Sequence, residues 1–208
     1  MNTAFTASKT AFDLLRGFGR RPPPKERCEL CGLEIAGEHP HVLRRSTGQI
    51  LCACQACGIL FHHRQEESRD LVRIPRRSIK LPDFSINDQD WAALRLPIEL
   101  AFFIYRSANG RVAAYYPSPA GSTESLLSLD AWEQIRHANP SLGQMQPDVE
   151  ALLVDRTRGH RRYFLAPIDQ CYRLTGLIRL HWRGFSGGDQ VWSEVDRFFA
   201  SLEESHGA

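Results

Sequence analysis

The sequence predicts an α+β fold in two parts, a small cysteine-rich module followed by a larger domain of β-hairpins and helices. Five of the six cysteines lie between residues 28 and 57. Beyond residue 82, short apolar strand-like runs separated by turn signals alternate with segments whose apolar residues recur at helical spacing. With 42% hydrophobic and 24% charged residues, the chain of 208 residues can bury an ordinary core.

The composition divides the chain into four segments. Residues 1–27 are expected to be a flexible tail, because three consecutive prolines from Pro22 stop any short helix formed by Phe12 to Phe18. A partner-binding helix is the alternative for that tail. We expect a four-cysteine module at residues 28–63, a linker of charges and prolines at 64–82, and an α+β domain at 83–205.

The cysteine module consists of two Cys-x-x-Cys-Gly sequences, and the paired cysteines are Cys28, Cys31, Cys54 and Cys57. The 22 residues between the pairs slightly exceed the spacing of roughly 15–20 that is usual in zinc sites of this kind. Four thiolates fill a tetrahedral metal site and leave no position for water, so such a site is structural. The glycine after each pair is expected to permit a tight reversal of the chain.

A hairpin is expected between the two pairs. The runs His41–Arg44 and Gln49–Leu51 flank a turn at Ser46-Thr47-Gly48. Strand, turn and strand between two cysteine pairs are typical of a zinc-ribbon or rubredoxin-like knuckle module. Zinc is the predicted ion and mononuclear iron the alternative, because both accept tetrahedral sulfur.

Three further residues are candidates near this site. Cys52 is an alternative ligand in place of Cys54, a thiol that lies beside the site, or a redox-active thiol. His39 and His41 are alternative ligands as well, and would make a mixed site or a second one. The competing interpretation places these histidines, with His62 and His63, on loops around a site that four cysteines already complete.

The larger domain is expected to begin with a short helix after Ser85–Asp88 that carries Trp91 and Leu94. The run Ile98–Tyr105 is apolar on both faces, which predicts a central strand covered on each side. Asn109-Gly110 predicts a hairpin from this strand to a second strand at Val112–Tyr116.

The rest of the domain is also expected to consist of helices and a β-hairpin. Ser128 is expected to cap a helix that ends at Asn139-Pro140, and a second hairpin is expected from Ala151 to Ala166. Residues 169–183 fit either a helix or a strand, and a helix from Asp169 is favoured. The spacing of Val191, Val195, Phe198, Phe199 and Leu202 predicts a terminal amphipathic helix.

The sequence has no P-loop and no GxGxxG or HExxH pattern, which are motifs of common enzyme classes. Cys171 has no evident histidine partner and is interpreted as a buried structural thiol. Residues 1–80 carry 14 Lys and Arg against 8 Asp and Glu, which raises a nucleic-acid-binding regulator as an alternative. That alternative is disfavoured, because acidic residues interrupt the basic run and aromatics for base stacking are scarce there.

Three stretches resemble an uncharacterised bacterial family often encoded beside [NiFe]-hydrogenase genes. They are Cys28-Glu-Leu-Cys31-Gly with Glu38-His-Pro-His41, the run Cys52-x-Cys54-x-x-Cys57 ending in Leu60-Phe61, and Ile178 to Gly188. The resemblance implies an accessory role in hydrogenase maturation, assembly or electron transfer, with a hydrogenase subunit or maturation factor as partner.

The sequence therefore predicts a non-enzymatic, metal-binding accessory protein with a protein partner. A rubredoxin-like iron electron carrier and a zinc-ribbon nucleic-acid-binding regulator are the two rivals. No apolar run reaches the roughly 18–20 residues of a membrane span, and the N-terminus has no leader pattern, so a cytoplasmic location is expected.

Overall fold

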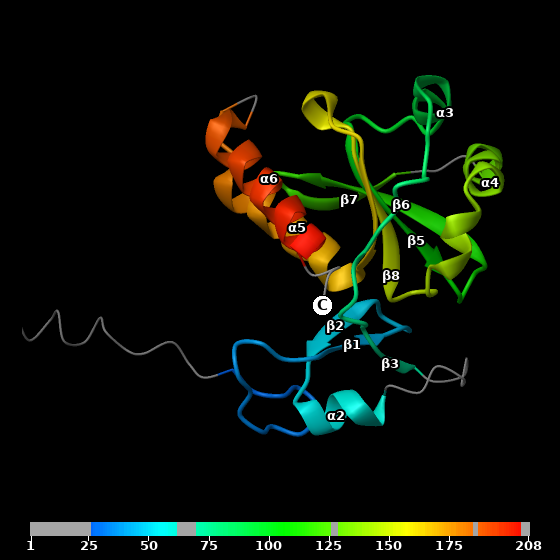
Figure 1. Ribbon diagram of the computed structural model, residues 1–208. Coiled ribbons are helices and arrows are strands. Elements are labelled where there is room, and N and C mark those ends of the chain that lie inside the picture. The colour runs from blue at the N-terminus through cyan, green and yellow to red at the C-terminus, as the bar shows by residue number, and fades with distance from the viewer. Residues whose placement is uncertain (1–25, 62–69, 126–128, 185–186, 205–208) are drawn as a thin grey trace, which may run out of the picture.

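The computed structural model describes residues 26–61, 70–125, 129–184 and 187–204. Two antiparallel sheets with flanking helices make an α+β fold, as predicted (Figure 1). The expected tail at residues 1–27 lies almost wholly outside the described residues, as do His62, His63 and the predicted cap Ser128. Within the described residues, no helix is both long enough and apolar enough to cross a membrane.

The smaller sheet belongs to the cysteine module. The predicted hairpin is confirmed as β1 (His41–Arg44) and β2 (Gln49–Cys52), and α2 (Gln55–Leu60) follows it. A third strand, β3 (Leu71–Arg73), pairs with β1 and gives the order β2-β1-β3. This strand lies in the segment that the composition suggested as a linker, so part of that segment is regular structure.

The larger sheet has six strands in the order β4-β9-β8-β5-β6-β7, and every neighbouring pair is antiparallel. Both predicted hairpins are confirmed and join into this one sheet, because β5 pairs with β8. The strands are β4 (Ile79–Lys80), β5 (Leu100–Arg106), β6 (Arg111–Ser118), β7 (Gly121–Ser125), β8 (Glu150–Asp155) and β9 (Arg162–Pro167).

Helices cover both faces of the larger sheet (Figure 1). One face packs against α5 (Ile168–His181) and α6 (Gly188–Glu204), and the other against α3 (Asp88–Ala93) and α4 (Leu129–Ala138). The ambiguous segment 169–183 is therefore mostly helix. Short 3-10 turns, η1 (Pro140–Gln144) and η2 (Thr157–Gly159), complete the connections.

Strand β5 is central and buried on both sides, as its apolar run predicts. Phe102 stacks on Tyr115 in the core beneath α5 and α6, with ring centroids 5.4 Å apart. Phe103, on the opposite face, stacks on Trp132 of α4 at 5.4 Å. Side chains that alternate between two cores explain why neither face of this strand is polar.

The start of α3 differs from the prediction. The cap is Asn87, whose side-chain oxygen accepts a hydrogen bond from the backbone N–H of Asp90 at 2.7 Å, and Ser85 lies before the helix. Ser85 is engaged elsewhere, because its backbone N–H donates to the side chain of Asn139 at 2.8 Å. Asparagine is as good a cap as serine, so the choice depends on this tertiary contact.

The two sheets are joined by apolar and ionic contacts. Leu43 of β1 and Ile74, just after β3, are buried in the core beneath α5 and α6. Arg45 lies 3.0 Å from a carboxylate oxygen of Asp148, and Arg77 lies 2.7 Å from Glu150, which is fully buried. These two arginines, which are among the 14 basic residues of segment 1–80, therefore bind carboxylates of the α+β domain.

Candidate metal centre

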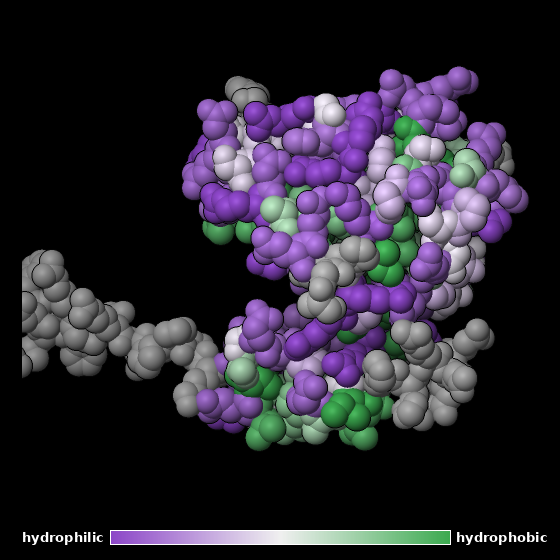
Figure 2. All heavy atoms as spheres, viewed as in Figure 1, coloured by the Kyte–Doolittle hydropathy of each residue, from purple (hydrophilic) through white to green (hydrophobic). Residues whose placement is uncertain are grey.

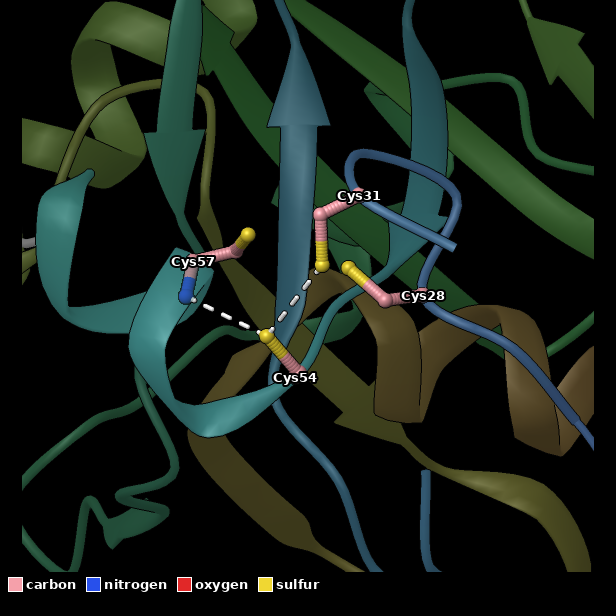
Figure 3. Close-up of side chains that lie close together, drawn as sticks. All are labelled: Cys28, Cys31, Cys54 and Cys57. Carbon is pink, nitrogen blue, oxygen red and sulfur yellow. Dashed lines mark hydrogen bonds between the residues drawn. The ribbon is translucent and has the colours of Figure 1, made fainter. Parts of the chain in front are cut away.

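The four predicted cysteines converge on one point (Figure 3). Cys28 and Cys31 come from the first loop, and Cys54 and Cys57 from the start of α2. Their four sulfur atoms lie within 4.8 Å of one another, and those of Cys31 and Cys54 are 3.7 Å apart. A zinc–sulfur bond of about 2.3 Å gives a tetrahedron whose edges are about 3.8 Å, so the arrangement fits a tetrahedral ion. All six cysteines of the chain are free thiols.

The first loop folds tightly around Cys28. Its backbone N–H donates to the carbonyl of Leu33 at 2.7 Å, and its carbonyl accepts from Gly32 at 2.8 Å. Gly32 has a φ of +77°, a left-handed conformation that side chains other than glycine rarely adopt. The predicted reversal after the first cysteine pair is therefore confirmed.

The second cysteine pair is built differently. Cys54 caps the N-terminus of α2, and its sulfur accepts a hydrogen bond from the backbone N–H of Cys57 at 3.5 Å. Gly58 lies inside α2 with an ordinary φ, so the expectation of a permissive turn at this glycine is wrong. Glycine is needed there for space, because a Cβ at position 58 would lie 2.8 Å from the Cβ of Pro40.

The environment makes the four thiols unequal. Burial acts to raise the pKa of Cys28, but hydrogen bonds from the backbone of Cys54, Leu30 and Cys31 outweigh it and lower this pKa to about 6. Burial and the neighbouring thiols raise the pKa of Cys57 to about 12. A bound cation would hold all four as thiolates, since metal ligation deprotonates cysteine.

Cys52, His39 and His41 do not join this centre. Their ligand atoms form a second group, within 4.8 Å of one another. The backbone N–H of Cys52 donates to the carboxylate of Glu29 at 2.6 Å, and burial followed by the charge of Glu29 raises the pKa of the Cys52 thiol. The sequence shows these three residues as candidates, but their grouping depends on cross-strand register, which residue spacing does not reveal.

Three large apolar side chains that follow the cysteine–glycine pairs in sequence are exposed. Leu33 follows the first Cys-Gly pair and is 60% exposed, and Ile59 and Leu60 follow the second and are 57% and 63% exposed. Hydrophobic atoms are visible on the end of the molecule that carries α2 (Figure 2). We call Leu33, Ile59 and Leu60 the knuckle patch. The sequence indicates these positions, since Leu33 directly follows the first cysteine–glycine pair and Ile59 and Leu60 directly follow the second.

Cys171 belongs to neither group of candidate ligands. It lies on α5 and is completely buried in the core that α5 and α6 cover, and burial raises its pKa well above the ordinary value. Its side chain packs among apolar residues, as the interpretation of a structural thiol requires.

Comparison with protein families gives a match over most of the chain. A family of unknown function, DUF5947, matches residues 27–206. Neither the comparison with curated proteins nor the comparison with solved structures found a match. The matched region begins beside Cys28 and includes the cysteine module and the whole six-stranded sheet.

Proposed function

The chain belongs to the family of unknown function DUF5947, and we propose that it is a metal-binding accessory protein that docks on a protein partner. The observation that carries this proposal is the convergence of four sulfur atoms with a tetrahedral edge of 3.7 Å. Zinc is the ion that we propose. A closed set of four thiolates supports a structural role, because no position is left for water or substrate.

The metal would give the module its shape. The core around the cysteines contains only five buried residues among those that the structure describes, which are Cys28, Val42, Ala53, Cys54 and Cys57. So small a core stabilises a folded structure poorly, and metal–ligand bonds can supply the missing free energy. In this proposal the ion orients both loops, and the loops present the knuckle patch to a partner.

The partner we propose first is a [NiFe]-hydrogenase subunit or a maturation factor for one. The resemblance of the three sequence stretches supports this partner class, and the exposed knuckle patch supports a protein surface as its target. We place the protein in the cytoplasm, where the reducing environment would keep its six thiols free.

A second candidate is a rubredoxin-like electron carrier with one iron. Cys31 favours it, because this ligand is exposed while the other three are buried. An exposed ligand would bring the ion close to a redox partner docked on the knuckle patch. Protein purified without oxygen distinguishes the two: iron gives a coloured centre that bleaches reversibly on reduction, whereas zinc gives no visible absorbance.

The docking role is tested by removing the apolar surface without touching the ligands. The triple variant Leu33→Ser, Ile59→Ser and Leu60→Ser should retain its metal and lose at least tenfold in affinity for purified hydrogenase subunits or maturation factors of the same organism. Leu180→Ser is the matched control, because Leu180 is 64% exposed on α5. Equal binding by both variants would refute docking through the knuckle patch.

A further inference from the structure

Three side chains outside the four-cysteine centre converge at the end of the β1–β2 hairpin. His41 opens β1 and pairs directly with Cys52, the last residue of β2. Directly paired residues of antiparallel strands project from the same face, and His39 lies two residues before His41. The ligand atoms of the three residues lie within 4.8 Å of one another, and the two imidazole centroids are 4.9 Å apart.

This cluster faces away from the four-cysteine core. Val42 is packed with Cys28 and Cys54, whereas Leu43, its neighbour on the opposite face, lies in the core beneath α5 and α6. His41 lies two residues before Leu43, so both side chains project from the same face of β1, the face toward the α+β domain. There its Nδ1 atom lies 2.7 Å from Oδ2 of Asp169, in the first turn of α5.

The hydrogen bonds of both histidines define which nitrogen is available to a ligand. Nδ1 of His39 lies 2.9 Å from the carbonyl oxygen of Ala36, and Nδ1 of His41 lies beside the carboxylate of Asp169. Both partners accept hydrogen bonds, so each Nδ1 must carry the proton that it donates. In a neutral imidazole this leaves the lone pair on Nε2, the nitrogen free to bind a metal.

One of these nitrogens is buried without a partner. Nε2 of His39 makes no hydrogen bond to any residue that the structure describes, and only 9% of the side chain is exposed. A buried polar atom without a partner is costly and rare, and a bound ion is one of the ways in which proteins satisfy such an atom. A metal ion bound by Nε2 would remove this cost.

Space for an additional ligand lies beside the cluster. A cavity of about 320 Å³ is lined by His39, His41 and Asp169, together with Arg76 and Arg173. An ion held by the three side chains would have three protein ligands, and a tetrahedral ion takes four. The fourth position could therefore be filled from the cavity by water or by an anion, which the arginines would favour.

We propose that His39, His41 and Cys52 hold a second metal ion, a divalent ion of the zinc class with an exchangeable fourth ligand. Two imidazoles and a thiolate suit zinc, whereas magnesium and calcium take oxygen ligands. Asp169 is a positioning residue that fixes the tautomer and orientation of His41, as carboxylates do behind metal-bound histidines. The site uses none of the four cysteines of the first centre, so a negative result for this site would not contradict the proposed function.

The test is a metal count on the full chain, reduced, stripped with a chelator, reloaded with Zn²⁺ and separated from excess ion. The wild type should retain two zinc ions per chain, and Cys52→Ser and His41→Ala should each retain one. His137→Ala is the matched control, with an exposed histidine on α4, and should retain two. Cobalt loading shows whether each variant is folded, because an intact four-thiolate centre keeps its intense visible spectrum.

Two results would overturn the second site. One is a wild type that binds a single ion, with no loss in Cys52→Ser; this result leaves the four-cysteine centre standing. The other concerns Cys31→Ser, a variant that removes a ligand of the first centre and should lose the four-thiolate cobalt spectrum. If Cys52→Ser loses this spectrum as well, Cys52 belongs to the first centre. Asp169→Asn should weaken binding of the second ion by about 10–100-fold at unchanged stoichiometry, and unchanged affinity would refute its positioning role.

Discussion

At the scale of single residues, two helical glycines illustrate how packing decides the effect of one methyl group. Gly58 in α2 faces Pro40, and a Cβ there would meet the proline ring atoms at 2.8 and 3.0 Å. Gly176 in α5 is exposed, and a Cβ there would meet nothing within 4 Å. Both positions have ordinary helical backbone, so the difference between them is steric.

Alanine substitution should therefore have opposite effects at the two glycines. Gly58→Ala should destabilise the cysteine module by about 1–3 kcal/mol, because Pro40 or α2 must shift. Gly176→Ala should stabilise the protein by about 0.5–1 kcal/mol, because alanine loses less backbone entropy in a helix. Urea unfolding of both variants in their metal-loaded form measures the two changes, and a stabilised Gly58→Ala would contradict the close approach of α2 to Pro40.

At the scale of elements, the β8–β9 hairpin is held by a buried carboxylate. Asp155 is completely buried and accepts hydrogen bonds from the backbone N–H and hydroxyl of Thr157 at 2.9 and 2.6 Å. It also accepts a bond from Arg162 at 2.7 Å, and the guanidinium of Arg162 lies 4.3 Å from the ring centroid of Phe199 in α6. Asp155 thus connects the turn to β9, and through Arg162 it is linked to α6.

Removing this carboxylate should cost far more than removing an exposed one. Asp155→Ala is expected to destabilise the domain by about 1–3 kcal/mol, since Thr157 would lose two hydrogen bonds and the largely buried Arg162 would keep only its ion pair with Asp196. Glu133→Ala on α4 is the matched control, because its ion pair with Arg136 is about half exposed and should contribute little. Thermal unfolding of both variants gives the comparison, and similar melting temperatures would argue against the role of Asp155.

The elements also show how much of the fold could be predicted. Strand β5 and helix α6 were predictable, because Phe102 and Phe103 lie in a strand-length apolar run and Val191 begins a set of apolar residues at helical spacing. Strands β3 and β4 were not, because two or three residues among charges and prolines carry no periodicity, and β1 and β9 recruit them through tertiary pairing. Strand β7 is polar along its length and was missed for the same reason.

The candidate sites divide in a similar way. The four cysteines could be grouped from sequence, because the Cys-x-x-Cys spacing is local and each pair shapes its own loop. The cluster of His39, His41 and Cys52 could not, since it depends on the register that pairs His41 with Cys52. Asp169 comes from α5, 128 residues along the chain from His41, and only the tertiary structure brings it there.

At the scale of the whole molecule, the two parts differ in how they are stabilised. The six-stranded sheet has a core on each face, formed by long apolar strands and four helices. The cysteine module contributes Leu43 and Ile74 to one of these cores but has a very small core of its own. We therefore expect the domain to remain folded without the module, and the module to depend on a bound metal and on the domain.

Metal removal should accordingly unfold one part of the chain and leave the other intact. Chelation under reducing conditions should increase amide hydrogen exchange across β1, β2 and α2, while the central strands β5 and β8 stay protected. Metal-loaded protein is the reference, and readdition of zinc should restore protection. Loss of protection in β5 equal to that in β1 would contradict this independence. It would mean that the contacts of Leu43, Ile74, Arg45 and Arg77 couple the two parts into one cooperative unit.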